Sequence, residues 1–445
     1  MAHGKWKRRE ILKAGGLVAA AAALPASAAS TRAPIAPSAS SVASPPTPAS
    51  PPASTSASPS TSSPASPSVA SAASAVSPPA SPPAPPSLAR LSFAPQLSSY
   101  PKPPRPVTAI VLGAGNRGNV YASYARQFPD ELKIVGVAEP IPHRRSYLGN
   151  LHGIPPERQW VTWEHALQVP KFADALIITT PDHLHYGPAM GGLGLDYDLL
   201  LEKVIAQSWD QCRAILDRAV SKGRIVAVCH VLRYTPYFRK LKEVVDSGRL
   251  GRVTSIQHME PVEHVHMSHS FVRGNWRNSR ESNPMILSKS CHDLDILRWT
   301  IGRPCRRVSS FGSLSYFRPG NAPAGAPARC TDGCPVEAAC PFSALKIYMR
   351  VRAWLPALRL EREDDATVLK ALREGPYGRC VFHCDNDVVD HQVTSLEFEG
   401  GVTAAFSMEA LTSYAGRRTR VMGTKGDAVG DEATLTVTEF ATGAQ

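Results

Sequence analysis

The sequence predicts a two-domain α/β protein: a doubly wound parallel sheet of the Rossmann type, followed by an α+β domain with an open, mostly antiparallel sheet. Two observations predict the first domain. A glycine-rich turn follows an apolar run, and short apolar strands alternate with helical patterns from about 104 to 231. The second domain is predicted because residues 232–445 begin with an amphipathic helix and continue mainly as strands. The 445 residues suffice for both domains and a long N-terminal tail.

The N-terminal tail divides into two parts. In residues 1–30 a basic start containing Arg8 and Arg9 precedes a short apolar run and an Ala-Ser-Ala cleavage pattern, which predicts a twin-arginine export signal. We therefore expect an extracellular or wall-associated protein; a misplaced start codon would instead leave it cytoplasmic. Residues 31–103 contain mainly Pro, Ser, Ala and Thr, so we expect a disordered linker.

A Gly-x-Gly-x-x-Gly motif follows the first strand pattern, at 109–112. The first glycine permits a tight turn, the second lets the backbone approach a pyrophosphate, and the third lets the next helix pack on the strand. The free N–H groups at the helix start favour that anion. The spacing therefore predicts dinucleotide binding. The predicted contacts are Gly113, Gly115, Asn116, Arg117 and Gly118.

Polar residues end the next strands of this domain. Glu139 ends the second strand and is placed to accept a ribose hydroxyl, which favours NAD because an acid repels a 2′-phosphate. Arg144 and Arg145 follow closely and keep NADP as an alternative. Ligands of such sheets bind beyond the carboxyl ends of the strands. The other expected cofactor contacts at those ends are Thr180, Pro181, His185, Glu202 and Lys203.

The order of these motifs resembles the Gfo/Idh/MocA oxidoreductases, which are named for glucose–fructose oxidoreductase, inositol dehydrogenase and a rhizopine-catabolism protein. The resemblance covers about residue 105 to the end. This chain has Glu202-Lys203-Val204 where the family has Glu-Lys-Pro. The resemblance implies a nicotinamide cofactor and makes Lys203 a catalytic cation that polarises the reacting oxygen.

His292 begins a predicted helix in the second domain. The resemblance implies that a histidine here takes the proton of a substrate hydroxyl as hydride leaves for the nicotinamide. Many family members place an aspartate four residues earlier, where this chain has Ser288 followed by Lys289. We therefore expect Lys289 to act as a second catalytic cation or to bind a substrate carboxylate.

Further polar residues of the second domain are candidates for substrate binding. Residues 271–277 hold two arginines around a tryptophan, a combination suited to a sugar ring that carries a carboxylate. A solvated loop is the alternative interpretation. The predicted substrate-binding residues are Arg233, Arg273, Trp276, Arg277, Asp295 and His391.

Five of the nine cysteines fall in a Pro/Gly-rich insert at about 319–384. Such clustering in a loop is unusual for thiols that merely pack in a core. It predicts structural zinc, with an iron–sulfur cluster or disulfides as alternatives. The candidate metal ligands are Cys330, Cys334, Cys340, Cys380 and Cys384.

The combined hypothesis is an exported NAD(P)-dependent oxidoreductase that moves hydride to or from a carbinol of a sugar, sugar acid or cyclitol. One alternative is a glycosidase that retains NAD and acts by transient oxidation and elimination. Another is an exported sugar-binding protein on the same fold without catalysis. The substrate expected in each case is a small carbohydrate.

Other partners are expected as follows. The formal charge is +12, but the sequence lacks an aromatic-interleaved basic stripe, so we expect no nucleic acid. We expect no transmembrane segment in the mature chain. The resemblance implies a homo-oligomer formed through the second sheet. Members of the family usually continue into a final helix, so we expect that the sequence ends early.

Overall fold

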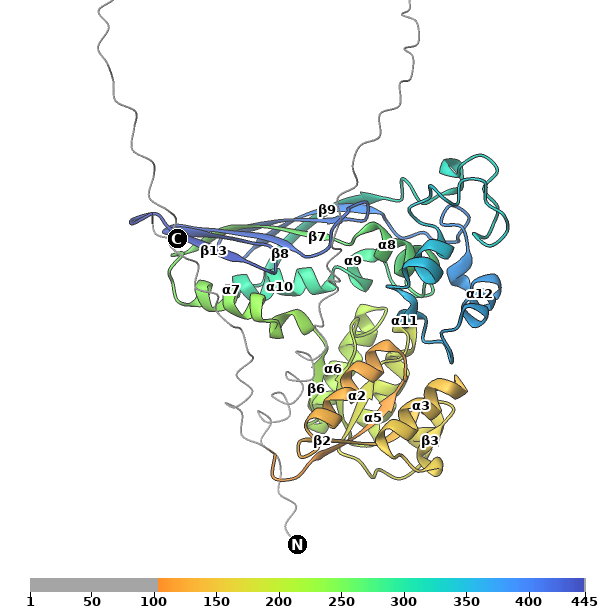
Figure 1. Ribbon diagram of the computed structural model, residues 1–445. Helices are drawn as coiled ribbons and strands as arrows, with labels where there is room; N and C mark the ends of the chain where they lie inside the picture. Colours follow the sequence, from red (N-terminus) through yellow and green to blue (C-terminus); the bar gives the residue numbers. More distant parts are fainter. Residues whose placement is uncertain (1–102, 444–445) are drawn as a thin grey trace, which may run out of the picture. The chain divides into compact units, whose positions relative to one another are not determined.

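The computed structural model describes residues 103–443 (Figure 1). The predicted export signal at 1–30 and all but the last residue of the predicted linker at 31–103 lie outside the described residues. Two sheets form the frame of the described part, one of six strands and one of seven. The predicted fold class, a Rossmann-type domain followed by an α+β domain, is confirmed.

The first sheet is parallel throughout and has the order β3-β2-β1-β4-β5-β6. This is the order of a dinucleotide-binding sheet, in which the crossover reverses between β1 and β4. The apolar runs of the sequence form its buried central strands. The strands are β1 (Val107–Leu112), β2 (Leu132–Ala138), β3 (Gln159–Trp160), β4 (Ala175–Ile178), β5 (Asp198–Leu201) and β6 (Val226–Val228).

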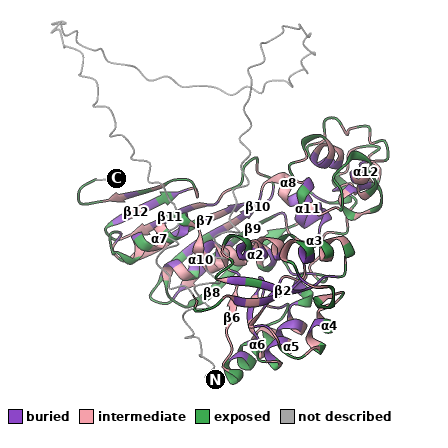
Figure 2. Cartoon of the chain, turned by 60° about the horizontal axis from the view of Figure 1, so that its bottom comes forward, coloured by how far each residue is buried: buried purple, intermediate pink, exposed green. Residues whose placement is uncertain are grey.

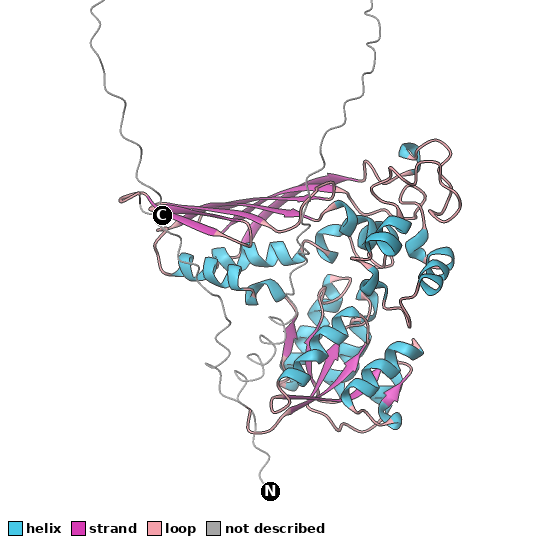
Figure 3. Cartoon of the chain, viewed as in Figure 1, coloured by secondary structure: helices cyan, strands magenta, loops and turns pink. Residues whose placement is uncertain are grey.

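Helices cover both faces of this sheet. Successive residues of a strand point to opposite faces, and the apolar side chains of the central strands are buried on both. Ala109 and Val111 belong to one buried cluster, whereas Ile110 and Leu112 belong to another. The helices are α2 (Asn116–Gln127), α3 (Pro142–His152), α4 (Trp163–Gln168), α5 (Tyr186–Gly194) and α6 (Trp209–Lys222), with short turns η2 (Pro156–Arg158), η3 (Asp182–Leu184) and η4 (Val231–Tyr234). The layered arrangement is visible in Figure 3.

The second sheet has the order β13-β12-β11-β7-β10-β9-β8. The β7–β10 pair is parallel and the other neighbouring pairs are antiparallel, so the predicted mostly antiparallel character is confirmed. The strands are β7 (Val253–Pro261), β8 (Cys305–Ser313), β9 (His391–Phe398), β10 (Val402–Glu409), β11 (Arg418–Gly423), β12 (Gly426–Gly430) and β13 (Leu435–Glu439).

Helices α7 (Pro236–Asp246) and α10 (Cys291–Ile301) lie along one face of the second sheet (Figures 1 and 3). Helix α7 begins with Thr235, whose hydroxyl caps the helix, and its apolar side packs into the core of the domain. The other helical segments before β8 are α8 (His264–Met267), the π-helical η5 (Ser268–Arg273) and α9 (Met285–Ser288).

The opposite face of this sheet is open in the described chain. All nine residues of β8 are exposed, among them Val308 and Phe311, and burial alternates along β9 and β10. Figure 2 shows the buried and exposed residues of these strands. The predicted homo-oligomer stays a prediction. Within residues 103–443, no helix combines the length and the apolar character needed to cross a membrane.

The predicted cysteine-rich insert forms a helical extension beside β9 (Figure 1). It has a small hydrophobic cluster of its own, in which Tyr348 and Leu372 are buried. Its helical segments are η6 (Pro319–Asn321), the π-helical η7 (Leu345–Val351), α11 (Leu355–Leu358), α12 (Asp365–Glu374) and η8 (Pro376–Gly378).

Candidate active site

The glycine-rich turn joins β1 to α2, and close backbone contacts exclude a side chain at its first and third glycines. Gly113 has a φ of +98°, and a Cβ there would lie 2.6 Å from the carbonyl oxygen of Thr179. A Cβ at Gly118 would lie 2.1 Å from the carbonyl oxygen of Gly113. At Gly115 a Cβ would meet no atom within 4 Å. The turn therefore leaves space beside Gly115 and the first N–H groups of α2, from Asn116 onward, which fits a pyrophosphate.

Glu139 follows β2 and is buried beside this turn. Its carboxylate accepts hydrogen bonds from the backbone N–H of Ala114 at 2.7 Å and of Ile141 at 3.0 Å. Arg144 and Arg145, which left NADP as an alternative cofactor, have other partners. Arg145 donates to the carbonyl oxygen of Glu139, and Arg144 donates to that of Leu358 in the insert. The carboxylate of Glu139 therefore lies directly beside the glycine-rich turn, and both arginines are held by backbone carbonyl oxygens.

Glu202 ties the end of β5 to α2. Its Oε1 accepts from the Tyr121 hydroxyl at 2.5 Å and from Arg117 Nε at 2.8 Å, and its Oε2 accepts from the backbone N–H of Lys203 at 2.9 Å. Glu202 and Arg117, both predicted cofactor contacts, are thus bound to each other. Their direct role is to fix the strand end from which Lys203 projects.

Two loops meet at His185. Its Nε2 lies 2.9 Å from the carbonyl oxygen of Thr180, and its Nδ1 lies 2.5 Å from that of Val204. Pro181 directly precedes the η3 turn. The Lys203–Val204 peptide bond is cis, at the position where the sequence lacks the family proline. The imidazole therefore links the Thr180 loop to the segment that follows Lys203.

The side chain of Lys203 extends from the first domain to a backbone carbonyl of the second. Its Nζ donates to the carbonyl oxygen of Ser288 at 2.8 Å and lies 5.4 Å from the centre of the Trp276 ring. The indole N–H of Trp276 donates in turn to Asp182 at 3.1 Å. Trp276, a predicted substrate residue, and Lys203, the predicted catalytic cation, are thus brought together.

His292 lies in the first turn of α10, and its Nδ1 is buried without a hydrogen-bond partner in the described structure. Burial, followed by the positive charges of Lys203 and Arg417, lowers the pKa of His292 well below its ordinary value. The imidazole is therefore neutral near pH 7 and able to accept a proton. The ring of His230 lies edge-on, 6.2 Å from that of His292.

Lys289 is not a free cation, because its Nζ lies 3.1 Å from Glu260 Oε1. Arg417 Nη2 lies 2.6 Å from the other oxygen of Glu260, and Arg417 Nε donates to Asp293 at 2.6 Å. His258 completes the network at 3.0 Å from Asp293. The aspartate that the resemblance places four residues before the histidine is replaced by Ser288, and the acid that faces Lys289 is Glu260 of β7.

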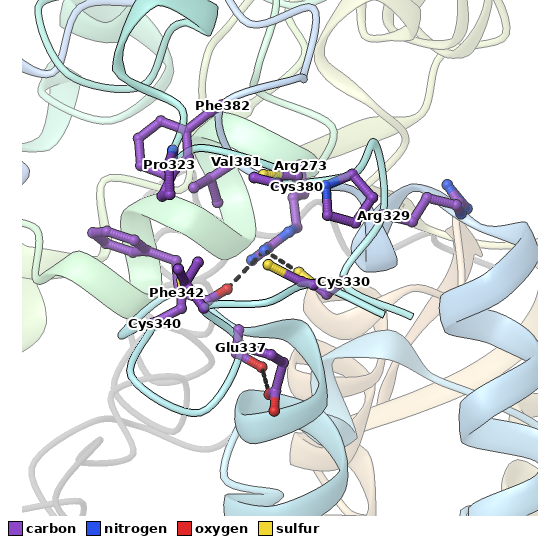
Figure 4. Close-up of a pocket in the computed structure, with 15 residues that line it drawn as sticks. Arg273, Pro323, Arg329, Cys330, Glu337, Cys340, Phe342, Cys380, Val381 and Phe382 are labelled. Carbon is purple, nitrogen blue, oxygen red and sulfur yellow. Dashed lines mark hydrogen bonds between the residues drawn. The ribbon is translucent and has the colours of Figure 1, made fainter. Parts of the chain in front are cut away.

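The remaining predicted substrate residues have partners within the protein. Arg233 and Asp295 form a two-bond ion pair with each other, at 2.7 and 2.5 Å. Arg277 binds Asp385 and Glu281, and His391 binds Asp390. The expectation that Lys289, Arg273 and Arg277 favour an acidic substrate is weakened, because Lys289 and Arg277 are neutralised internally and Arg273 points into a cavity of the insert (Figure 4).

The predicted zinc site is not supported. All nine cysteines are free thiols, and within residues 103–443 no three His, Cys, Asp or Glu side chains are arranged to hold a metal ion. A zinc ion needs four donors at about 2.0–2.3 Å from one point. Four of the five predicted ligands instead line the insert cavity, and Cys384 is not among its lining residues.

Several residues of the site escaped the sequence analysis. Glu260 and His258 end a strand pattern that carried no motif, and Arg417 lies more than 120 positions from Asp293. His230 follows β6 at a carboxyl strand end, which is the one signal that pointed to its position. Asp182 lay inside the Thr180–His185 motif but was not singled out.

Comparisons with known families cover both domains. Residues 107–230 match the family model described as an oxidoreductase family with an NAD-binding Rossmann fold. Residues 238–429 match the model described as the GFO/IDH/MocA C-terminal domain.

Among individual relatives, YteT of Bacillus subtilis (strain 168), which carries an oxidoreductase name, is 27% identical over 276 residues. That alignment covers 61% of this chain and 63% of the relative. The scyllo-inositol 2-dehydrogenase (NAD(+)) of the same strain is 23% identical over 214 residues, 47% of this chain and 58% of the enzyme. The chain thus spans less than two thirds of the length of these relatives.

Solved structures show the same fold. The aldose-aldose oxidoreductase from Caulobacter crescentus superposes with a TM-score of 0.54 at 15% identity, covering 77% of this chain and 82% of that one. The WlbA dehydrogenase from Bordetella pertussis, solved with NADH and UDP-GlcNAcA, gives a TM-score of 0.54 at 16% identity and covers 76% and 84%.

Proposed function

The chain belongs to the Gfo/Idh/MocA family of oxidoreductases with an NAD-binding Rossmann fold, and from this membership we propose that it is an NAD-dependent dehydrogenase of a neutral sugar or cyclitol. One observation carries the proposal: Lys203, at a carboxyl strand end of the nucleotide domain, reaches the segment that leads into His292. The charge of Lys203 acts on the pKa of His292, and Lys203 follows β5 at the same sheet edge as the turn that fits a pyrophosphate. Inositol dehydrogenases among the relatives support a polyol substrate.

We assign the roles as follows. The turn at Gly113–Gly118 and Glu139 would hold the dinucleotide, which when bound supplies the hydride acceptor. Lys203 stabilises negative charge on the reacting oxygen. His292 accepts the hydroxyl proton, because its imidazole is neutral. Trp276, beside Lys203, provides an apolar surface for a sugar ring.

A neutral substrate is proposed because the cations expected to bind a carboxylate are engaged within the protein. Lys289 faces Glu260, and Arg277 faces Asp385 and Glu281. The test is NADH formation by the full chain with an inositol, an aldose and the matching uronic acid. We expect kcat/KM at least about 10-fold higher for the neutral polyols, a difference of about 1.4 kcal/mol.

The same assay separates the alternatives. Cleavage of a glycoside with retained NAD and no net NADH would establish the glycosidase instead. NAD binding without turnover of any carbohydrate would favour the non-catalytic binding protein. Failure to bind NAD or NADP at millimolar concentration would refute the oxidoreductase proposal.

The loss of the Lys203 cation should slow turnover. We expect Lys203→Met to lower kcat by about 10²–10³-fold, because a preorganised donor to the developing alkoxide is removed. Steady-state kinetics and a separate NAD titration measure the effect, and affinity for NAD should change little. Lys222→Met, at an exposed lysine of α6, is the matched control. Equal activity of the two variants would contradict the role of Lys203.

Glu139 should set the cofactor preference. Glu139→Gln keeps an acceptor for the Ala114 N–H but removes the charge that repels a 2′-phosphate. We expect the ratio of NAD to NADP affinity to fall by about 10-fold, measured by fluorescence titration of both nucleotides. Glu157→Gln, at an exposed residue of η2, should leave the ratio unchanged. An unaltered ratio in Glu139→Gln would show that the acid does not face the ribose.

Two further proposals concern the chain outside the catalytic site. We propose export by the twin-arginine route, which Arg8 and Arg9 support, and assembly into a homo-oligomer, which the exposed face of β8 supports. Fractionation of a producing cell with and without an Arg8→Lys, Arg9→Lys change tests the first. The mass of the purified chain by light scattering tests the second.

A further inference from the structure

A cavity in the cysteine-rich insert has no part in hydride transfer as proposed above. Four cysteines line it, three from the loop at 330–340 and the fourth, Cys380, from the segment after η8 (Figure 4). The cavity has a volume of about 360 Å³, which includes its open mouth. The enclosed space therefore exceeds that of a single water molecule.

The backbone places two of these cysteines on one face of a short antiparallel pairing. Arg329 is paired with Arg379, and the Cys330 and Cys380 N–H groups donate across to Gly378 and Ala328. Cys330 follows Arg329 and Cys380 follows Arg379. The two cysteines therefore point to the same face of the pairing and lie diagonally across from each other. Diagonal Cα atoms lie about 7–8 Å apart, whereas a disulfide joins Cα atoms about 4.4–6.8 Å apart. The pairing thus directs both thiols to one space without suiting a disulfide between them.

Arg273 projects into the same cavity and is completely buried. Its Nε donates to the carbonyl oxygen of Arg379 and its Nη2 to that of Phe342, both at 2.7 Å. The Nη2 also lies 3.7 Å from Cys330 Sγ, and Nη1 is buried without a partner in the described structure. Within residues 103–443, the groups that its side chain contacts are carbonyl oxygens and a thiol, and none is a carboxylate. A buried guanidinium remains charged and is costly unless an anion faces it.

We propose that this cavity binds an iron–sulfur cluster through Cys330, Cys334, Cys340 and Cys380, with Arg273 as its positively charged hydrogen-bond donor. Four cysteine thiolates are the usual ligand set of such clusters. In a cluster the four ligand sulfurs bind different iron atoms, so they need not converge on one point as the ligands of a single zinc ion do. A thiolate-bound cluster is anionic, so it supplies the counter-charge that Arg273 lacks.

Cluster binding replaces the thiol protons of the four cysteines with bonds to iron. The four thiols release four protons and their sulfurs form four bonds to iron, while iron and inorganic sulfide come from solution or from an assembly protein. The Arg273 guanidinium donates its free N–H to a sulfur of the cluster or of a ligand. The cluster then joins the 330–340 loop to the segment that carries Cys380, and no residue of the proposed hydride-transfer site takes part.

The first measurement uses the full chain purified without oxygen. We expect about four iron atoms and about four acid-labile sulfides per chain, with the broad visible absorption of iron–thiolate charge transfer. Where the protein is isolated empty, ferrous and ferric iron in equal amounts, added with sulfide in the absence of oxygen, should restore this content. Zinc at about one per chain without sulfide would overturn the proposal. Failure of reconstitution would overturn it too, as would a mass two hydrogens lower that reports a disulfide among these cysteines.

Variants locate the cluster. Cys330→Ser should lower iron and sulfide content at least five-fold, whereas Cys384→Ser should keep both within about a fifth of the unmodified chain. Cys384 is the matched control because it lies in the same insert, with Sγ 3.3 Å from the Cys380 carbonyl oxygen, but does not line the cavity. Arg273→Gln should make the reduction potential of the cluster more negative, because a positive charge is lost. Equal iron in Cys330→Ser and Cys384→Ser would contradict this ligand set. NAD titration of the same samples reports separately on the first domain.

Discussion

Replacing His292 with glutamine is expected to lower kcat by about 10²–10⁴-fold while leaving the affinity for NAD unchanged. The imidazole is the proposed proton acceptor, and glutamine fills a similar space without being able to take a proton. Its Nδ1 is buried and has no partner in the described structure, so no protein group occupies that nitrogen. Single-turnover and steady-state measurements of NADH formation would give the effect. His165→Gln, at an exposed histidine of α4, is the matched control.

The pH dependence tests the same role by a second route. Burial and the charges of Lys203 and Arg417 place the pKa of His292 well below 6.5, so its base form persists as the pH falls through that value. The rate of carbinol oxidation should therefore stay level through pH 6.5 and decline only at lower pH. The His292→Gln variant should lose this acid limb. A wild-type acid limb with its midpoint at or above 6.5 would contradict the assignment.

Arg417→Met is expected to lower the free energy of unfolding by about 3–5 kcal/mol, because it removes the cation shared by two buried carboxylates and leaves Glu260 with Lys289 alone and Asp293 with His258 alone. Arg417 lies between Glu260 and Asp293, at 2.6 Å from each, and all three are buried. Chemical denaturation of the full chain measures the change. The matched control is Arg420→Met, three residues later in β11, where a half-exposed ion pair with Asp427 should contribute about 0–1 kcal/mol.

The acid dependence of this effect has a definite sign. The Arg417 guanidinium and His258 hold the pKa of Asp293 well below its usual value of 3.8, against the opposing effect of burial. The ion pair therefore contributes its stability above that value and loses it as the pH falls through the depressed pKa. The difference between wild type and Arg417→Met should shrink only in strongly acidic solution. Equal destabilisation by Arg417→Met and Arg420→Met at neutral pH would show that the network is unimportant.

The sequence predicted those parts of the site that local chemistry determines. The glycine spacing, Glu139 and Lys203 could be identified because each ends a recognisable strand, and parallel strands bring their carboxyl ends to one edge. The partner of Lys289 could not be predicted in this way. Glu260 is 29 positions before Lys289, on β7 of the second sheet. The packing of α10 on that sheet brings Asp293 close to Glu260, so that Arg417 contacts both carboxylates.

Arg273 shows how a correct local pattern can mislead. Its neighbours Trp276 and Arg277 suggested a sugar-binding loop. The π-helical turn η5 instead buries Arg273 against the carbonyl oxygens of Phe342 and Arg379, more than 65 positions away. Side-chain direction over such a turn depends on the tertiary contacts of the insert, which carry no signature in the local sequence.

The contacts between α3 and the insert have a thermodynamic consequence. His143 and Arg144 bind the carbonyl oxygens of Arg359 and Leu358, and α3 begins just after Glu139. Any free energy that nucleotide binding adds to or removes from these two hydrogen bonds would pass to the insert through this one short helix. Such coupling is reciprocal: the factor by which nucleotide raises the insert's affinity for its own ligand equals the factor by which that ligand raises affinity for nucleotide.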